Sequence, residues 1–332
     1  KNTLGGVMDS NIRKALLFIV SAVWLFAIPW TAQAEFPDRP IELIVPTPPG
    51  GGTDMTGRKL AEAAEKVLGQ KVVVVNKPGA AGSIGMSVLT QVKPDGYTLA
   101  YVWNAPLTIV PHTMNVPYKT SDLTPITQVT GGTPLIFCVR PDFPAETGQE
   151  FVDHIKANPN KYTYGNDGIG ATVQLAGERL FQPLGIKLRA VPFGGAGETL
   201  KNFLGGHIDI YGGSIPPILG HVKAGKARCV LVTTAQRSSV LPDTFSAGDL
   251  GLADKATELF RGVVGPAGLP ADRLATLQKA FAEATHSEVV TTYLKKRGEL
   301  PIGSTSDDFK KKILAEYAAN ASILKGLGLS KN

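Results

Sequence analysis

Four glycine-rich segments hold the residues of this 332-residue sequence that are best suited to bind a small ligand. They cover 46–54, 76–85, 164–172 and 191–197, and each follows a strand-like apolar run and precedes a helix-like stretch. Glycine lets the backbone approach a ligand closely, and a helix N-terminus presents free N–H donors with a partial positive charge. One such segment is equally typical of a tight turn. Four in one chain favour a binding site for an anion, such as a carboxylate, phosphate or sulfate.

The sequence contains no complete catalytic set. Segment 220–227 departs from the phosphate-binding loop pattern at Ala227, where Ser or Thr is needed. Ser83 lies in a near match to the nucleophile elbow, but Ala81 replaces its first glycine. Asp54 is a candidate general base and equally a residue that braces the first helix. Because no nucleophile, base and oxyanion donors occur together, we expect no enzyme. A cleft hydrolase that uses Asp54 or Ser83 is the alternative.

Histidine and cysteine give little sign of metal chemistry. None of the five histidines has the spacing of a metal site: His112, His154, His207, His221 and His286. We therefore expect no metal and no cofactor. Cys138 and Cys229 both lie in apolar strand-like runs. They can pair in an oxidising compartment, but we favour two buried free thiols.

Apolar runs that alternate with amphipathic stretches predict an α/β fold. Strand-like runs at 41–45, 71–75 and 97–103 alternate with helical patterns at 53–68 and 83–90. This order predicts a parallel sheet with helices on both faces. The Val-rich run 71–75 indicates a strand that is buried on both faces.

A second α/β unit follows. Two strand-like runs without a helix between them lead into it, at 124–129 and 134–140. We expect its helices at 151–157, 172–181, 196–204 and 218–224, and its strands at 162–165, 188–191, 208–211 and 228–233. A strand at 259–264 crosses back, and two helices close the chain, at 271–287 and at 307–324 with Ser306 as cap. Two lobes joined by two crossings predict a cleft, where small ligands usually bind. We place the first lobe at 35–133 and 258–332, and the second at 134–257.

Composition excludes several classes of protein. Apolar residues make up 43% and charged residues 19%, which excludes a disordered chain and a multi-span membrane protein. The net charge is +6, with no Lys/Arg stripe, so we expect no nucleic acid as partner. The basic runs 295–297 and 310–312 lie on amphipathic helical stretches, and we interpret them as solvated faces.

The N-terminus has the pattern of a secretory signal peptide. Arg13 and Lys14 precede a fourteen-residue apolar run, 15–28, and the small-residue pattern Ala32-Gln33-Ala34 follows. We predict cleavage after Ala34 and a periplasmic protein. A retained membrane anchor is the alternative, although fourteen residues are short for a membrane span. The chain begins with Lys1, so we suspect Met8 as the true start.

A series of motifs along the chain resembles one family. The motifs are Phe-Pro-Asp-Arg-Pro-Ile at 36–41, Pro-Gly-Gly-Gly-Thr-Asp at 49–54, Asn-Lys-Pro-Gly-Ala-Ala-Gly at 76–82, Pro-Asp-Gly-Tyr-Thr-Leu at 94–99, Leu-Gly-Gly-His-Ile-Asp at 204–209 and Gly-Pro-Ala-Gly-Leu-Pro at 265–270. In this order and spacing they resemble the periplasmic substrate-binding proteins of tripartite tricarboxylate transporters, the Bug or TctC-like family. The resemblance covers residues 36 to about 327.

The resemblance implies a two-lobed Venus-flytrap fold, of the type II periplasmic-binding-protein class, which closes over a small organic acid. It also implies a set of binding residues in the glycine-rich turns and on the cleft wall. By match these are Thr47, Gly50, Gly51, Gly52, Thr53, Asp54, Ala80, Gly82, Asn104, Ala105, Asn166, Asp167, Gly170, Ala171, Thr172, Gly194, Gly195, Ala196, Tyr211 and Ser214. Trp103 and Phe193 are added as rings that can stack on a ligand.

Three departures from the family pattern bear on the ligand. Asn166-Asp167-Gly168 stands where a Ser-Ser-Gly turn is common, Gln174 replaces a His, and Phe193-Gly194-Gly195 replaces Tyr-Lys-Gly. Asp167 adds a negative charge and the usual Lys is absent. We therefore expect a ligand less acidic than a tricarboxylate: a monocarboxylate, an aromatic acid, or a neutral or cationic compound such as an amide.

The resemblance further implies integral-membrane transporter subunits as partners, and we expect a monomer. A ligand sensor that presents its bound form to a membrane kinase is the alternative, because both roles use the closed form.

Overall fold

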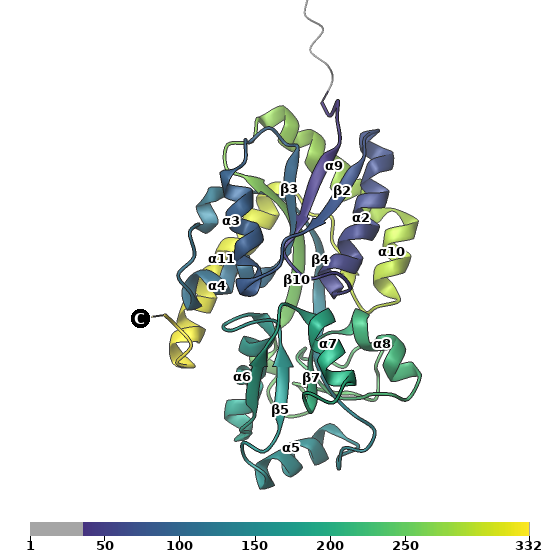
Figure 1. Ribbon diagram of the computed structural model, residues 1–332, viewed down its shortest axis with the longest axis vertical. Coiled ribbons are helices and arrows are strands. Elements are labelled where there is room, and N and C mark those ends of the chain that lie inside the picture. Colours follow the sequence, from purple (N-terminus) through teal and green to yellow (C-terminus); the bar gives the residue numbers. More distant parts are fainter. Residues whose placement is uncertain (1–35, 332) are drawn as a thin grey trace, which may run out of the picture. The chain divides into compact units, whose positions relative to one another are not determined.

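The computed structural model describes residues 36–331, in which strands and helices alternate along the chain (Figure 1). The predicted signal peptide, its cleavage site and the suspected start at Met8 lie outside these residues. Within 36–331, no helix is both long and apolar enough to cross a membrane.

The first lobe is built on a sheet with the strand order β2-β1-β3-β10-β4. Strands β1 (Ile41–Val45), β2 (Val72–Asn76) and β3 (Thr98–Trp103) are parallel, as the alternation of patterns predicts. Helices α2 (Gly52–Leu68) and α3 (Ser83–Gln91) connect them. Because β2 is the edge strand, Val73 is half exposed, and the prediction that this strand is buried on both faces is wrong.

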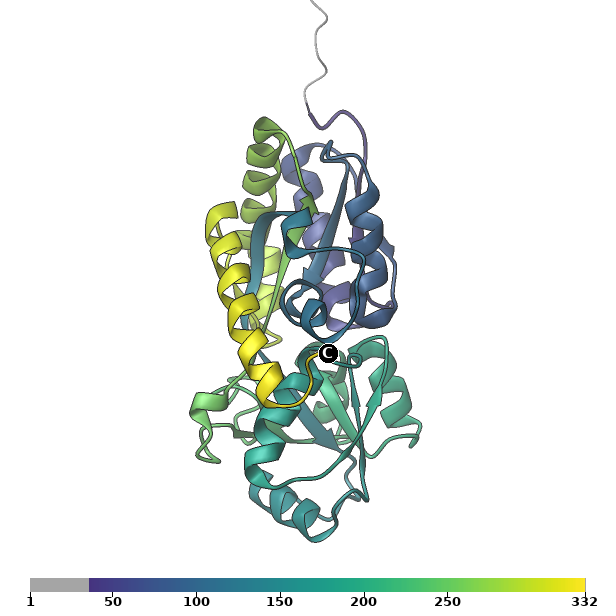
Figure 2. The same ribbon diagram turned by 90° about the vertical axis from the view of Figure 1, so that its left-hand side faces the viewer.

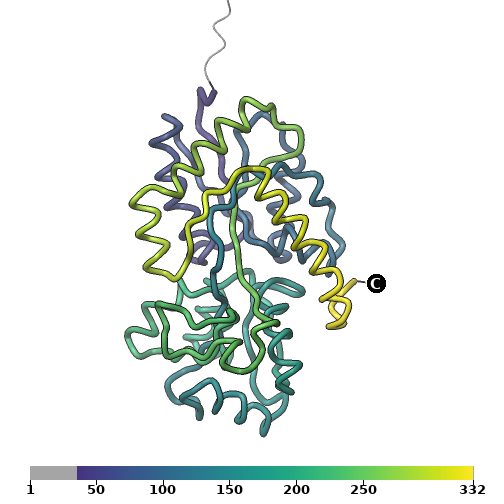
Figure 3. The backbone as a smooth tube through the Cα atoms, turned by 180° about the vertical axis from the view of Figure 1, so that it is seen from behind, coloured from purple at the N-terminus to yellow at the C-terminus, as the bar shows by residue number. Residues whose placement is uncertain are grey.

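Strand β4 (Leu123–Val139) is continuous over 17 residues, although the sequence predicts two strands here. It pairs with β10 (Glu258–Pro266) as far as Pro134 and with β7 (Ile210–Ser214) from Leu135 onward. Gly132 takes a positive φ of 58°, and the glycine pair 131–132 bends the strand without ending it. β4 and β10 therefore run side by side from one lobe to the other, as Figure 3 shows.

The second lobe adds β5 (Thr163–Asn166), β6 (Arg189–Pro192), β8 (Arg228–Val232) and β9 (Phe245–Ser246) to β7 and the end of β4. Its helices are α5 (Gly148–Ala157), α6 (Thr172–Leu184), α7 (Ala196–Leu204) and α8 (Ile215–Lys223). A short π-helical turn (Ala105–Ile109) and α4 (Val110–Thr113) complete the first lobe before the crossing.

Three helices close the chain, where the sequence predicts two: α9 (Ala271–His286), α10 (Glu288–Lys295) and α11 (Ser306–Gly326). Helix α10 follows α9 after a break at Ser287, whose side chain caps it. The two-residue strand β11 (Leu300–Pro301) pairs with β4. Thr305, rather than Ser306, caps α11, which runs along one side of the first lobe (Figure 2). Lys310 and Lys311 are exposed, but Lys312 is half-buried, so this basic run is only partly a solvated face.

Cys138 of β4 and Cys229 of β8 form a disulfide, so the preference for two free thiols is wrong. The two residues lie directly opposite each other on antiparallel strands. The sequence places both in apolar runs but does not reveal that β4 and β8 are neighbours. Only the pairing of strands 91 residues apart brings the sulfurs together.

One apolar core continues from the first lobe into the second. Trp103 and Val264 belong to the same buried cluster as Phe137 and Val173. The two lobes therefore share one continuous apolar cluster.

Candidate functional site

The first glycine-rich turn leads from β1 into the N-terminus of α2. Gly50 takes a positive φ of 84°, and its N–H donates to Asp54 Oδ2 at 2.9 Å. Asp54 Oδ1 accepts from Asn76 Nδ2 and pairs with Arg58, both at 2.9 Å. These contacts occupy the carboxylate of Asp54, which is 3% exposed. Asp54 therefore braces the turn, the structural role that the sequence offers as an alternative to a general base.

The fourth turn leads into α7 and meets the first turn from the other lobe. Gly195 takes a positive φ of 150° just before the helix. A Cβ added at Gly197 would lie only 2.9 Å from the backbone nitrogen of Gly51. The N-termini of α2 and α7 thus lie against each other, and both contribute partial positive charge to the same place. Glycine permits a close approach here between two backbones, while its close approach to a ligand stays a prediction.

A small cavity lies beside these two helix N-termini, and we call it the solute cavity. Its volume is about 30 Å³, near the share of one water molecule in the liquid. Nine of the predicted binding residues line it: Thr47, Gly51, Gly52, Thr53, Trp103, Asp167, Gly195, Ala196 and Ser214. Five further lining residues are not among those predicted: Leu135, Val173, Gly213, Leu259 and Arg261.

Arg261 of β10 is the main residue that the sequence analysis misses. Its side chain is 1% exposed, donates to Glu299 Oε1 at 2.7 Å and to Thr53 Oγ1 at 3.2 Å, and lines the solute cavity. Glu299 is also buried, so the pair is held away from water. A cation within the apolar run 259–264 is the signal that could have pointed to it, because charged residues are rarely buried without a partner or a role.

Thr47 contributes an unused hydrogen-bonding group. Its side chain is 6% exposed, and its hydroxyl oxygen is buried with no hydrogen-bond partner among residues 36–331. Buried hydroxyls are normally paired, and Thr47 lines the solute cavity. The hydroxyl is therefore available to a ligand in this cavity.

The third turn places Asp167 opposite Trp103. The indole Nε1 of Trp103 donates to Asp167 Oδ2 at 3.1 Å, and the Val173 N–H donates to Oδ1 at 2.8 Å. Burial raises the pKa of the Asp167 carboxyl to about 6, against the opposing effect of these donors. Nearby, Thr172 donates to Asn104 Oδ1 at 2.9 Å. These two side-chain hydrogen bonds join the lobes.

The remaining predicted residues do not line the solute cavity: Gly50, Asp54, Ala80, Gly82, Asn104, Ala105, Asn166, Gly170, Ala171, Thr172, Phe193, Gly194 and Tyr211. Tyr211 is fully buried and its hydroxyl donates to the Ser214 carbonyl at 2.8 Å. Phe193 is partly buried against the core of the second lobe. Asn104 lines a different cavity. Whether these residues contact a ligand stays a prediction.

Two α/β lobes joined by paired strands, with glycine-rich turns facing each other beside a small cavity, define a periplasmic binding protein. Residues 56–329 match the model of the "Tripartite tricarboxylate transporter family receptor". The chain belongs to this family, as its motifs predict. Members are solute-binding receptors and not enzymes, so the hydrolase alternative is set aside.

Named relatives agree with this assignment. The chain is 33% identical to the "UPF0065 protein in gbd 5'region" of Cupriavidus necator, over 96% of this chain and 97% of that protein. It is similar to the solved structure of the periplasmic binding protein BugD, with 27% identity, a TM-score of 0.83, and coverage of 90% and 100%. It is also similar to Rpa4515 of R. palustris, solved with adipate, with 26% identity, a TM-score of 0.85, and coverage of 89% and 99%.

Proposed function

We propose that this receptor binds one small organic acid in the solute cavity and delivers it to a membrane transporter of the tripartite tricarboxylate type. The observation that carries the proposal is the meeting of two helix N-termini beside the buried cation of Arg261. A carboxylate at this point accepts hydrogen bonds from free N–H groups in a positive electrostatic field. The unpaired hydroxyl of Thr47 supports the same binding mode by supplying one further donor.

The charges around the cavity support a ligand less acidic than a tricarboxylate. Arg261 supplies the cation that the sequence lacks at the fourth turn, but Glu299 already balances it. Asp167 adds a negative charge when it ionises. One carboxylate group therefore suits this site better than three. Trp103 and Phe193 remain candidates for contact with an aromatic ring of the ligand. The other predicted residues remain candidates for contact with the rest of the ligand.

The remaining parts of the proposal follow from the family and the sequence. Residues 35–133 and 258–332 act as one lobe and 134–257 as the other, and the lobes separate to admit the ligand. The volume of the solute cavity supports this motion, because about 30 Å³ is too small for a whole dicarboxylate. The receptor acts in the periplasm as a monomer after cleavage behind Ala34.

A binding screen on the exported, processed protein tests the proposal. Native mass spectrometry and thermal shift are recorded with citrate, malate, adipate, benzoate and nicotinamide. A ligand at 100 times its Kd stabilises the folded state by about 2.7 kcal/mol, which raises Tm by several degrees. We expect one acid or amide to bind unchanged, with one molecule per chain.

Two results would contradict the proposal. If citrate binds more tightly than every monocarboxylate, the charge argument from Asp167 is wrong. If a bound compound returns chemically altered, the receptor role itself is wrong.

A further inference from the structure

A second cavity lies on the other face of β10, and we call it the hinge cavity. Side chains alternate between the two faces of a strand. Leu259 and Arg261 line the solute cavity, whereas Glu258 and Phe260 line the hinge cavity. The hinge cavity has a volume of about 220 Å³, while an apolar cavity of about 150 Å³ holds a benzene ring. It therefore has room for roughly nine non-hydrogen atoms.

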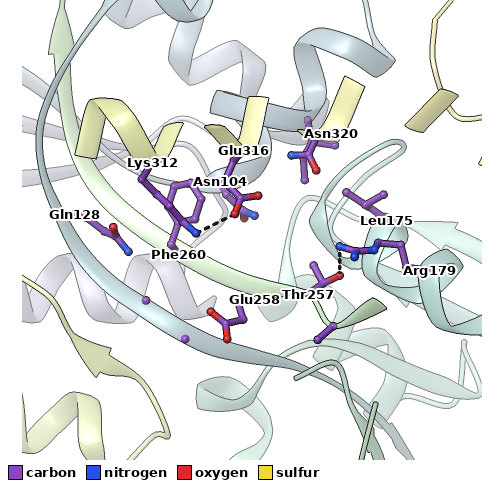
Figure 4. A pocket seen from close by; sticks show the side chains of 14 residues that line it. Asn104, Gln128, Leu175, Arg179, Thr257, Glu258, Phe260, Lys312, Glu316 and Asn320 are labelled. Atoms are coloured by element: carbon purple, nitrogen blue, oxygen red, sulfur yellow. Dashed lines mark hydrogen bonds and ion pairs between the residues drawn. The ribbon is translucent and has the colours of Figure 1, made fainter. Parts of the chain in front are cut away.

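Both lobes supply walls of the hinge cavity. Helix α11 of the first lobe contributes Lys312 and Glu316, and helix α6 of the second lobe contributes Arg179. Figure 4 shows these side chains around the cavity, with Phe260 and Thr257 between the helices. A ligand in this space contacts both lobes and both crossing strands.

The charged groups of the hinge cavity are only partly paired. Lys312 Nζ lies 2.9 Å from Glu316 Oε1, so these two side chains balance each other. Arg179 donates to Thr257 Oγ1 at 3.1 Å and to the Asp254 carbonyl at 3.5 Å, but it has no carboxylate within 4.0 Å among residues 36–331. In the same part of the chain, Glu258 has no cation within 4.0 Å.

Arg179 and Glu258 thus offer one cation and one anion without an ion-pair partner within 4.0 Å among residues 36–331. Burial lowers the pKa of the Arg179 guanidinium, and the nearby charges of Glu316 and Asp254 only partly oppose this effect. The cavity as a whole contains two positive and two negative side chains. A ligand with both charges and no net charge therefore fits better than an anion or a cation alone.

We propose that the hinge cavity is a second binding site, which takes a small zwitterion such as an amino acid or a betaine. The carboxylate of the ligand binds the guanidinium of Arg179, which can hold it through two parallel hydrogen bonds. The cationic group lies toward Glu258, and the apolar part packs against Phe260 and Leu175.

Titration calorimetry on the processed protein tests this site with L-valine, L-proline and glycine betaine. Isobutyrate and isobutylamine serve as the two halves of valine, with one charge each. We expect a zwitterion to bind, and each half to bind at least about tenfold more weakly. If none of the three zwitterions binds, the proposal is wrong.

Binding measurements on variants test which of the two cavities holds the zwitterion. Arg179→Gln and Glu258→Lys each remove one charge contact and should weaken zwitterion binding about tenfold or more. Glu283→Gln, at a half-exposed glutamate of α9 that lines neither cavity, is the matched control and should leave zwitterion binding unchanged. If Arg179→Gln does not fold, Glu258→Lys still decides, because Glu258 is exposed.

Thr47→Val separates this site from the solute cavity. It removes a hydroxyl that lines only the solute cavity, so zwitterion binding should persist. The proposal is overturned if Thr47→Val weakens zwitterion binding while Glu258→Lys leaves it intact. That result would mean that the zwitterion occupies the solute cavity. Failure of the proposed solute to bind there would not affect this comparison.

Discussion

At the scale of single residues, the hydroxyl of Thr47 allows a test of whether the solute binds in the solute cavity. Thr47→Val keeps the shape of the side chain and removes only the donor. Because the hydroxyl has no hydrogen-bond partner within the described part of the chain, we expect no loss of stability. We expect affinity for the solute to fall about tenfold or more, the effect of one hydrogen bond to a carboxylate. Calorimetric titration and thermal unfolding measure the two effects separately.

Thr133→Val is the matched control for this experiment. Thr133 is also fully buried with an unpaired hydroxyl, but it does not line the solute cavity. It should leave affinity unchanged. Equal loss of affinity in both variants would mean that Thr47 does not contact the solute.

Asp167 predicts a pH dependence of stability. Its pKa is raised to about 6 by burial, whereas an unfolded aspartate titrates near 4. The folded state therefore binds the proton more tightly than the unfolded chain does. Asp167 therefore lowers the free energy of unfolding as pH rises from about 4 to about 6. Above pH 6 this carboxyl is ionised in both states, and its contribution no longer changes with pH.

Asp167→Asn removes this titration. We expect the variant to gain stability relative to the natural protein as pH rises from about 4 to about 6. Tm measured across this range for both proteins gives the result. Two parallel curves would mean that Asp167 does not titrate in this window.

At the scale of elements, the contact between α2 and α7 depends on Gly197. A Cβ there would lie 2.9 Å from Gly51 N and 3.0 Å from Gly50 C, so Gly197→Ala pushes the two helix N-termini apart. Alanine has a higher helix propensity than glycine, so the substitution does not weaken α7 itself and disturbs only the contact between the lobes. We expect solute affinity to fall about tenfold or more while Tm changes little.

The control for that variant is Gly220→Ala within α8. A Cβ at Gly220 has no neighbour within 4 Å, so only helix propensity changes. Solute affinity should be the same as in the natural protein. A Gly197→Ala variant with unchanged affinity would show that the close approach is not needed for binding.

The disulfide between β4 and β8 is a second feature at this scale. It closes a loop with a sequence separation of 91 residues, so reduction should lower the free energy of unfolding by about 2–4 kcal/mol. Chemical denaturation with and without reductant measures this loss. The Cys138→Ala/Cys229→Ala double variant should unfold like the reduced protein and be insensitive to reductant.

At the scale of the whole molecule, the solute cavity is too small for a dicarboxylate unless the lobes separate. We expect the ligand-free protein to populate a more open form and the bound protein to be more compact. Small-angle scattering should show a smaller radius of gyration on saturation with solute. An unchanged radius would indicate that the ligand enters without separation of the lobes.

Much of the fold follows from the sequence because local patterns specify it. Apolar periodicity predicts β1 and α7 with their observed bounds. Three of the four glycine-rich segments, 46–54, 164–172 and 191–197, supply residues that line the solute cavity. The prediction of two separate strands around Gly132 is wrong, because β4 is continuous there. A glycine pair in the sequence indicates a turn as long as the strand that pairs with it is unknown. The family follows from the order of the motifs, which no single motif could establish.

The sequence by itself determined the α/β alternation, the order of the motifs and the positions of the glycine-rich turns, because these depend on neighbours along the chain. The tertiary structure decided that Cys138 meets Cys229 and that Arg261 lies beside Thr53, since these contacts join residues 91 and 208 positions apart. It also decided which of the predicted residues line the solute cavity. Such contacts depend on strand pairing and lobe packing, and no local pattern encodes them.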